Sequence, residues 1–411
     1  MKKSLKYSII FSAIFLLENN LSALALDNKI EIKTTDLKWR NKVKKIQILE
    51  SNNNYMIDNS SFIIKKDDFE DLKAYVLSKI NLKKYSEPEI FSKTLEWVST
   101  RWTHDGLNSG DDFSSLEILK NVEKGERYRC VEYGKVFSDI LSSLGYYSRS
   151  LGLMSIDVAY GDYGKGHVAS EVWSNELNKW VFFDPQFCIY TTYNNNPLNF
   201  YEIYQLFKDN KYDDIKFIIP DSYLTLYIKN NSDRIKNKED YINQYKDFLK
   251  NYFGAISISK KIDGDKFNLV LKLDNKEDFI TFQGQPYINN IFTNKVEDLY
   301  FKLNQTMVIF SYKEEEMNRI KELEKTIQIK TLEDLIKNKH LFYANPNFNL
   351  KFKNNFTDFS HYEVYVNDKK YELKNDSLEL FLEEGIYSII TKGISKFGIS
   401  GAKNYIKVSY N

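Results

Sequence analysis

Residues 129–144 read RCVEYGKVFSDILSSL, and they are the most informative stretch of the chain. The apolar side chains of this stretch recur at helical spacing: Val131, Val136, Phe137, Ile140, Leu141 and Leu144. Gly145 follows at the position where helices commonly end, so the pattern predicts a helix that begins at Cys130. A thiol at a helix start faces unpaired backbone N–H groups and the positive end of the helix dipole, which both favour the thiolate.

Three strand-like runs follow the predicted helix. They cover residues 146–154, 167–173 and 180–184, and residues 175–178 form a turn between the last two. If these two strands pair about the turn, His167 lies diagonally across from Asp184. His167 could then accept the thiol proton while Asp184 orients the imidazole, and an oxyanion would form near the backbone N–H of Cys130.

The chain has only two cysteines, Cys130 and Cys188. They could pair as a disulfide. Alternatively, Cys130 is a working thiol and Cys188 is a buried bystander. The position of Cys130 at a predicted helix start favours the second interpretation.

The residues around these positions resemble the core of the transglutaminase-like superfamily. The similarity covers about residues 87–186 and lies in four segments: CVEY at the cysteine, LGYYSR after its helix, GHVASEVW at the histidine and WVFFDP at the aspartate. The resemblance implies an α+β, papain-like fold in which a cysteine-bearing helix packs on an antiparallel sheet. It also implies Cys130 as nucleophile, His167 as base and Asp184 as orienting group.

Residues 102–108, WTHDGLN, look like an upstream element of exported bacterial members of that superfamily. The candidates for lining the cleft are Trp102, His104, Asn108 and Tyr128. Many members carry glycine two residues before the cysteine, where this chain has Tyr128. The second oxyanion donor therefore stays unassigned.

The expected organisation begins with a signal peptide at residues 1–25. A lysine-rich start, an apolar run from Tyr7 to Leu17 and the sequence Ala-Leu-Ala at 23–25 indicate export, with an uncleaved membrane anchor as the alternative. The later units are expected at 26–86 (lead-in), 87–220 (catalytic core), 221–344 (a helix and a β-rich middle region) and 345–411 (an immunoglobulin-like β-sandwich). The mature protein is thus predicted to be secreted or periplasmic, with no membrane span.

The 411 residues contain 58 Lys and Arg against 57 Asp and Glu, a net charge of +1 that argues against a nucleic-acid partner. No CxxC pair, HExxH motif or phosphate-binding glycine loop is present in the sequence. We therefore expect neither a metal nor a cofactor.

The leading functional expectation is an exported cysteine-dependent acyl-transfer enzyme. It would form a thioester at Cys130 on a peptide, protein or cell-envelope amide. Water would then give hydrolysis, which we favour, and an amine would give cross-linking. The alternative is a non-catalytic envelope binding or structural protein on a degenerate version of the same fold.

Overall fold

The computed structural model describes most of the chain beyond its amino-terminal region. The described residues are 46–52, 69–82, 84–161, 163–231, 233–262, 265–287, 289–328, 330–338, 341 and 347–410. The predicted signal peptide at 1–25 lies outside them. Among the described residues, no helix has the length and apolar character needed to cross a bilayer.

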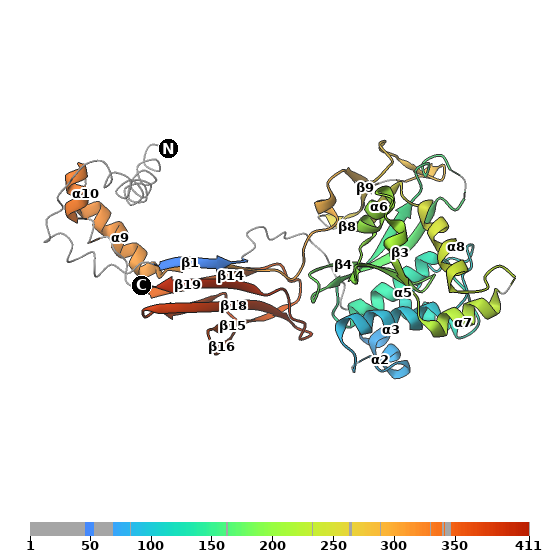
Figure 1. Cartoon of the computed structure of the whole chain (residues 1–411), viewed down its shortest axis with the longest axis horizontal. Helices are drawn as coiled ribbons and strands as arrows, with labels where there is room; N and C mark the ends of the chain where they lie inside the picture. Colours follow the sequence, from blue (N-terminus) through green and yellow to red (C-terminus); the bar gives the residue numbers. More distant parts are fainter. Residues whose placement is uncertain are drawn as a thin grey trace.

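The structure is a mixed α+β fold whose carboxy-terminal region is largely β (Figure 1). The helices are α2 (Glu70–Lys79), α3 (Glu87–Ser99), α4 (Ser115–Val122), α5 (Cys130–Ser143), α6 (Phe200–Lys208), α7 (Asp221–Asn230), α8 (Lys238–Lys250), α9 (Glu314–Thr326) and α10 (Leu332–Asn338). Short 3₁₀ helices occupy Tyr212–Asp214 and Val296–Asp298.

The largest sheet has the strand order β12-β9-β8-β2-β3-β4-β5-β6, with β7 paired to β5. Its strands are β2 (Ser148–Met154), β3 (Gly166–Ser174), β4 (Lys179–Asp184), β5 (Ile189–Tyr193), β6 (Asn196–Pro197), β7 (Lys216–Ile218), β8 (Ala255–Ile262), β9 (Asp265–Lys272) and β12 (Asn290–Thr293). A small hairpin, β10 (Thr281–Phe282) and β11 (Gln285–Pro286), lies outside this sheet. The predicted strands at 146–154, 167–173 and 180–184 are confirmed as β2, β3 and β4.

Helix α5 packs against β2 and β3, and α2, α3 and α4 pack against α5. The approach to β3 is close: a Cβ on Gly134 would lie 2.8 Å from Val168 Cγ1 and 3.2 Å from the carbonyl oxygen of Ala169. Gly145, with φ +95°, ends the helix as the sequence predicts. The glycine in the CVEYG segment therefore lets the cysteine helix lie directly on the strand that carries His167.

The carboxy-terminal region is a β-sandwich of two sheets. One sheet has the order β1-β19-β18-β15-β16 and the other β13-β14-β17. Its strands are β1 (Ile46–Ser51), β13 (Thr306–Tyr312), β14 (Asn347–Asn354), β15 (Phe359–Val366), β16 (Lys369–Leu373), β17 (Ser377–Phe381), β18 (Gly385–Ser395) and β19 (Asn404–Tyr410). Buried side chains from both sheets, including Val308, Phe352 and Val408, form its core.

The strand pairing divides the chain differently from the expected ranges. β13 precedes residue 345 but pairs along its length with β14, and β1, from the expected lead-in at 26–86, pairs with β19 (Figure 1). The strands β8 and β9 of the expected middle region continue the large sheet through the pairing of β8 with β2. Composition along the chain could not show this, because strand partners are set by tertiary contacts rather than by neighbouring sequence.

Some predicted elements differ in detail. The sequence pattern over 197–207 predicts a helix with Asn196 as its cap, but Asn196 and Pro197 form β6, and α6 begins after Asn199. Asn199 is the N-cap of α6 because Glu202, three residues later, completes a capping box with it. The sequence pattern over 299–310 likewise predicts a strand that begins at Leu299. Residues 299–305 instead form an irregular segment whose Leu299, Phe301 and Leu303 side chains are buried, and β13 begins at Thr306.

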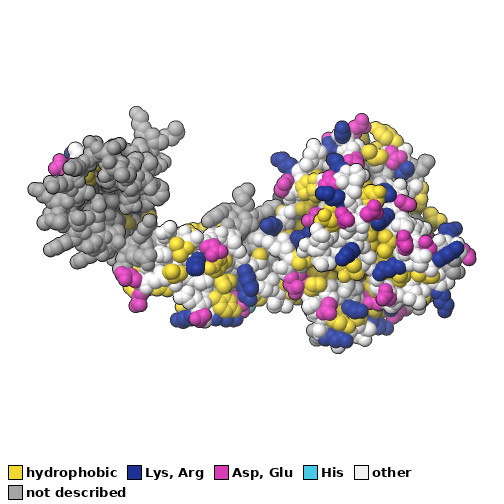
Figure 2. Space-filling view, in the orientation of Figure 1, with side chains coloured by type: hydrophobic (Ala, Val, Ile, Leu, Met, Phe, Trp, Pro, Cys, Tyr) yellow, Lys and Arg dark blue, Asp and Glu magenta, His cyan; other side chains and the backbone are white. Residues whose placement is uncertain are grey.

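Acidic and basic side chains are interspersed across the face of the molecule shown in Figure 2. This mixture matches the small net charge of the whole chain. Apolar side chains are scattered between them on the larger, mixed α+β part of the molecule.

Candidate functional site

Cys130 is the first residue of α5, immediately after the N-cap Arg129. Glu132, one per cent exposed, anchors this helix start. Its carboxylate accepts the backbone N–H of Arg129 at 3.1 Å and that of Gly110 at 2.8 Å, and it pairs with the Arg129 guanidinium at 2.9 Å. The end of α5 that carries the Cys130 thiol is therefore bonded both to its N-cap residue and to the preceding loop.

His167 and Asp184 meet across neighbouring strands as the sequence predicts. Ser170 pairs with Phe183 and Ser174 with Lys179, which places His167 diagonally across from Asp184. His167 Nε2 lies 2.8 Å from Asp184 Oδ2, and the two side chains are three per cent exposed and fully buried, respectively. A carboxylate only accepts hydrogen bonds, so Nε2 carries a proton and Nδ1 remains for the thiol.

Both oxygens of Asp184 are engaged by further donors. Tyr245 in α8 donates its hydroxyl to Oδ2 at 2.9 Å. The backbone N–H groups of Gln186 and Phe187 donate to Oδ1 at 3.2 and 3.3 Å. These bonds compensate the burial of the charge and fix the carboxylate plane against the imidazole.

Aromatic rings enclose the imidazole of His167. The ring of Phe248 lies 5.0 Å away between centroids, that of Tyr252 5.7 Å and that of Phe187 5.9 Å. They remove water from around the charged groups, which strengthens the interaction of the imidazole with Asp184 and with the thiol.

The electrostatics of the thiol favour the thiolate. Burial alone would raise the pKa of Cys130, but hydrogen bonds from His104, His167 and the backbone of Val168, with the charge of His167, lower it to about 6. Burial likewise opposes the charged form of His167, yet the adjacent Asp184 carboxylate raises its pKa above the usual range. Together these shifts describe a thiolate–imidazolium pair near neutral pH.

The second cysteine behaves in the opposite way. Cys188 is fully buried, and burial raises the pKa of its thiol to about 12. Both cysteines are free thiols in this structure. Of the two interpretations that the sequence left open, the structure therefore matches an accessible Cys130 and a buried Cys188.

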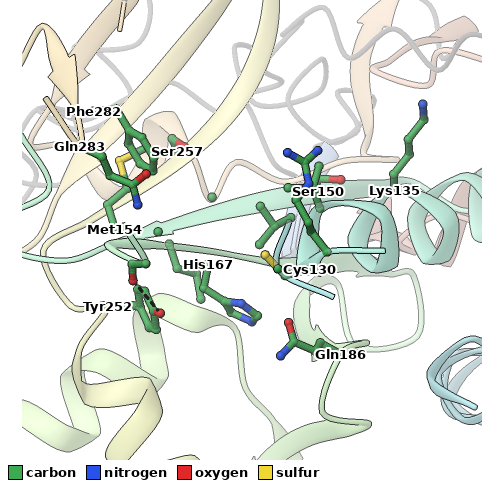
Figure 3. Close-up of a pocket in the computed structure, with 18 of the residues that line it drawn as sticks. Cys130, Lys135, Ser150, Met154, His167, Gln186, Tyr252, Ser257, Phe282 and Gln283 are labelled. Atoms are coloured by element: carbon green, nitrogen blue, oxygen red, sulfur yellow. Dashed lines mark hydrogen bonds between the residues drawn. The ribbon is translucent and has the colours of Figure 1, made fainter. Parts of the chain in front are cut away.

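Cys130 and His167 open into a cleft of about 680 Å³ (Figure 3). Its lining includes small residues of β2 and β8, among them Ser150, Gly152 and Ser257. Phe282 and Tyr287, from the β10–β11 hairpin region, also line it. The Cys130 thiol is thus reached from a cleft whose volume lies in the usual range of ligand-binding pockets.

The four candidates for lining the cleft have different positions. His104 lines it, is solvent exposed and contacts the thiol. Trp102 and Tyr128 are buried in the core, where the Trp102 indole donates to the backbone carbonyl of Tyr128 at 3.3 Å. Asn108 braces the loop by donating to the Arg127 carbonyl at 2.7 Å and does not line the cleft.

The sequence interpretation missed Tyr245, Phe248, Tyr252 and Gln186. Tyr245 and Phe248 lie in α8 and Tyr252 follows its end, all more than 60 residues beyond His167 in the chain. Their spacing of three and four residues indicates a single aromatic helix face, but it does not indicate what that face packs against. Gln186 follows the Asp184-Pro185 pair directly and lines the cleft.

One group among the described residues has the geometry to hold a metal ion: His361, Glu363 and Glu372 in the sandwich. The oxygens of Glu363 already pair with Lys370 at 2.5 Å and Lys392 at 2.8 Å. Two ammonium groups on one carboxylate oppose a further cation, so these residues fit an ion-pair cluster better than a metal centre.

No family model matches the chain, and no curated protein matches it either.

Proposed function

We propose that this protein is a cysteine-dependent acyl-transfer enzyme with Cys130 as nucleophile, His167 as general base and acid, and Asp184 as orienting group. One observation carries the proposal. The Cys130 thiol, at a helix start and with its pKa lowered to about 6, contacts His167, whose Nε2 is hydrogen-bonded to the buried carboxylate of Asp184. A nucleophile, a base and an orienting group in this order are the parts that acyl transfer needs.

The reaction follows from these contacts. The Cys130 thiolate attacks the carbonyl carbon of an amide, and the developing oxyanion is stabilised by the backbone N–H of Cys130 at the start of α5. His104, which touches the thiol from the opposite loop, supplies a second donor in this scheme. The C–N bond breaks as His167 Nδ1 protonates the leaving nitrogen, which leaves a thioester on Cys130.

The second half of the reaction releases the acyl group. Water, deprotonated by His167, attacks the thioester and regenerates the thiolate, which gives hydrolysis. An amine in place of water gives transamidation. We favour hydrolysis of a peptide or cell-envelope amide, as expected for an enzyme that works in an exterior rich in water.

We further propose that residues 87–220 form a papain-like core of the transglutaminase-like type. Its support is the order Cys130, His167, Asp184, a cysteine-bearing helix packed on the antiparallel strands that carry the other two groups, and the sequence resemblance. The same resemblance and the amino-terminal apolar run support export to the periplasm or exterior.

Iodoacetamide labelling across pH tests the nucleophile, because only the thiolate is alkylated. On native protein we expect Cys130 to react with a midpoint near pH 6. Cys188 should react only after unfolding, because it is buried and its pKa lies near 12. Cys130→Ala and Cys188→Ala form a matched pair, in which only the first removes the low-pH label.

Activity is then measured as acyl-enzyme formation with activated esters and as amide cleavage in peptide libraries. Cys130→Ala should abolish both, while Cys188→Ala should retain both. The non-catalytic alternative predicts an ordinary thiol, with a midpoint near pH 8.5 at Cys130, and no acyl-enzyme.

A further inference from the structure

Gln186 is held rigidly beside the catalytic groups of the proposed mechanism. Its backbone N–H donates to Asp184 Oδ1 at 3.2 Å, and its carbonyl oxygen accepts the Tyr223 hydroxyl at 3.3 Å. It lies two residues past Asp184, in the turn that follows β4. Figure 3 shows its amide beside the His167 ring and Cys130, and all three residues line the cleft.

The side-chain oxygen of Gln186 is an unusual feature of this cleft. Oε1 is buried, and no group among the described residues donates a hydrogen bond to it. An acceptor that is withdrawn from water without a partner costs free energy. Such an atom next to a general acid and base is suited to accept a hydrogen bond from the reacting molecule.

We propose that Gln186 Oε1 accepts an N–H from the nitrogen that leaves or enters during acyl transfer, an assignment that rests on the proposed function. The reacting nitrogen then lies between two groups. His167 Nδ1 exchanges one proton with it, and Gln186 Oε1 holds a second N–H. This contact orients the nitrogen lone pair along the line of the C–N bond that breaks or forms.

The proton and electron pairs balance in both directions. In acylation, the C–S bond forms, the C–N bond breaks, and the nitrogen takes a proton from the His167 imidazolium and departs as a neutral amine. In the reverse direction, an amine attacks the thioester, gives one proton to His167 and keeps the other N–H on Gln186 while the thiolate leaves. A primary amine provides both N–H groups, whereas a secondary amine provides only one.

The substrate class follows from this count of N–H groups. The leaving or accepting partner is a primary amine, and the amide that is cleaved or made carries one N–H, as a peptide bond between ordinary residues or an amide of a lysine side chain does. Amides of secondary amines, including bonds to proline nitrogen, lack the hydrogen that Gln186 accepts. The site should discriminate against them.

Aminolysis of a preformed acyl-enzyme measures this contact directly. Full-length protein is acylated with p-nitrophenyl acetate, and the products with methylamine and with dimethylamine, two amines of similar basicity, are quantified. Gln186→Met preserves side-chain length but removes the acceptor. We expect it to lower the methylamine rate about tenfold and to change the dimethylamine rate little, so that the ratio of the two rates falls about tenfold.

Two further variants separate this role from a general effect on the cleft. Gln186→Glu keeps an acceptor oxygen in place and should retain a wild-type ratio of the two rates. Gln283→Met changes the other glutamine of the cleft, whose side-chain oxygen, in its favourable amide orientation, accepts from the backbone of Gly164 and Lys165, and should also leave the ratio unchanged. The burst of nitrophenol in each variant reports whether the site is folded and acylated.

The outcomes that overturn the assignment differ from those that overturn the proposed function. Acylation of wild-type Cys130 with an equal loss for both amines in Gln186→Met refutes the amine contact alone, because the amide would then act on the acyl carbonyl. An unchanged ratio with a normal burst in Gln186→Met also refutes it. Failure of wild-type Cys130 to be acylated refutes the proposed function and the assignment together.

Discussion

The buried carboxylate of Asp184 accepts four hydrogen bonds, two at each oxygen. One comes from the His167 imidazole, and the other three hold the carboxylate still. Because the hydrogen bond to Asp184 holds the proton on Nε2, the imidazole keeps one tautomer, with Nδ1 directed to the thiol. Asp184 thus sets the charge state of His167, and His167 in turn sets that of Cys130.

Asp184→Asn tests this chain of effects. Removing the carboxylate charge takes away what raises the pKa of His167, so the imidazolium is lost at lower pH and the thiolate loses its partner. The pKa of Cys130 should then rise from about 6 towards its ordinary value, so alkylation at pH 7 slows and its midpoint moves upward. We expect acyl transfer to fall by roughly 10³ to 10⁴, by analogy with carboxylate loss in a serine triad.

Tyr245→Phe provides a graded comparison, because it removes one neutral donor from Asp184 and leaves the charge in place. Losing this one hydrogen bond should cost about 1 kcal/mol, so the rate of acyl transfer should fall by less than tenfold. If the pH midpoint of Cys130 alkylation instead stays near 6 in the Asp184→Asn variant, the thiol owes its low pKa to the helix end and His104 alone.

At the scale of elements, Glu132 joins the start of α5 to the preceding loop. Its buried carboxylate satisfies two backbone N–H groups and the Arg129 guanidinium. Glu132→Gln keeps an acceptor but removes the charge opposite Arg129, so we expect the free energy of unfolding to fall by about 1–3 kcal/mol. Denaturant titration of the intact protein measures this change.

Glu89→Gln is the matched control for Glu132→Gln. Glu89 occupies the same N3 position in the capping box of α3, but it is exposed to solvent. Glu89→Gln should lower the free energy of unfolding clearly less than Glu132→Gln does, because water replaces the lost interaction. Equal losses in the two variants would mean that the buried anchor of the cysteine helix contributes nothing beyond ordinary capping.

The elements that carry Cys130, His167 and Asp184 could be predicted because their signals are local. The apolar spacing of residues 131–144 defines α5, and the turn at 175–178 sets the register that brings His167 diagonally to Asp184. The capping box of Ser114 and Glu117 likewise predicts the start of α4. In each case the determining residues lie within one helix or one hairpin.

The surroundings of the site could not be predicted, because they depend on contacts between distant elements. Tyr245 and Phe248 follow helical spacing, but nothing in α8 shows that it packs beside β3 rather than elsewhere. The pairing of β1 with β19 joins residues more than 350 positions apart in the sequence. Alternation predicts that a strand exists, but it does not predict the strand's partner.

At the scale of the whole molecule, hydrogen bonds join the sandwich to the part of the chain that holds the large sheet. The Tyr147 hydroxyl donates to Asp358 at 3.1 Å and accepts the backbone N–H of Thr357 at 2.9 Å. Asn304 donates to Asn175 at 2.6 Å where the chain passes into β13. Among the described residues, those that line the Cys130 cleft lie between 104 and 287, and none of them belongs to the sandwich.

A shortened chain of residues 69–304 should therefore fold and keep a Cys130 alkylation midpoint near pH 6. It retains α2–α8, the large sheet and the segment of Phe301 and Leu303 that packs on Trp180.

A chain of residues 69–344 also retains β13 but lacks its partner β14. Val308 and an unpaired strand edge are therefore exposed in this longer fragment. We expect the longer fragment to aggregate and the shorter one to elute as a single species in size-exclusion chromatography, because strand pairing, rather than the change in composition near residue 345, sets the edge of the unit that carries the Cys130 site. If the 69–304 fragment is insoluble, or if its midpoint moves to about pH 8.5, then the sandwich is required to hold the thiol site together.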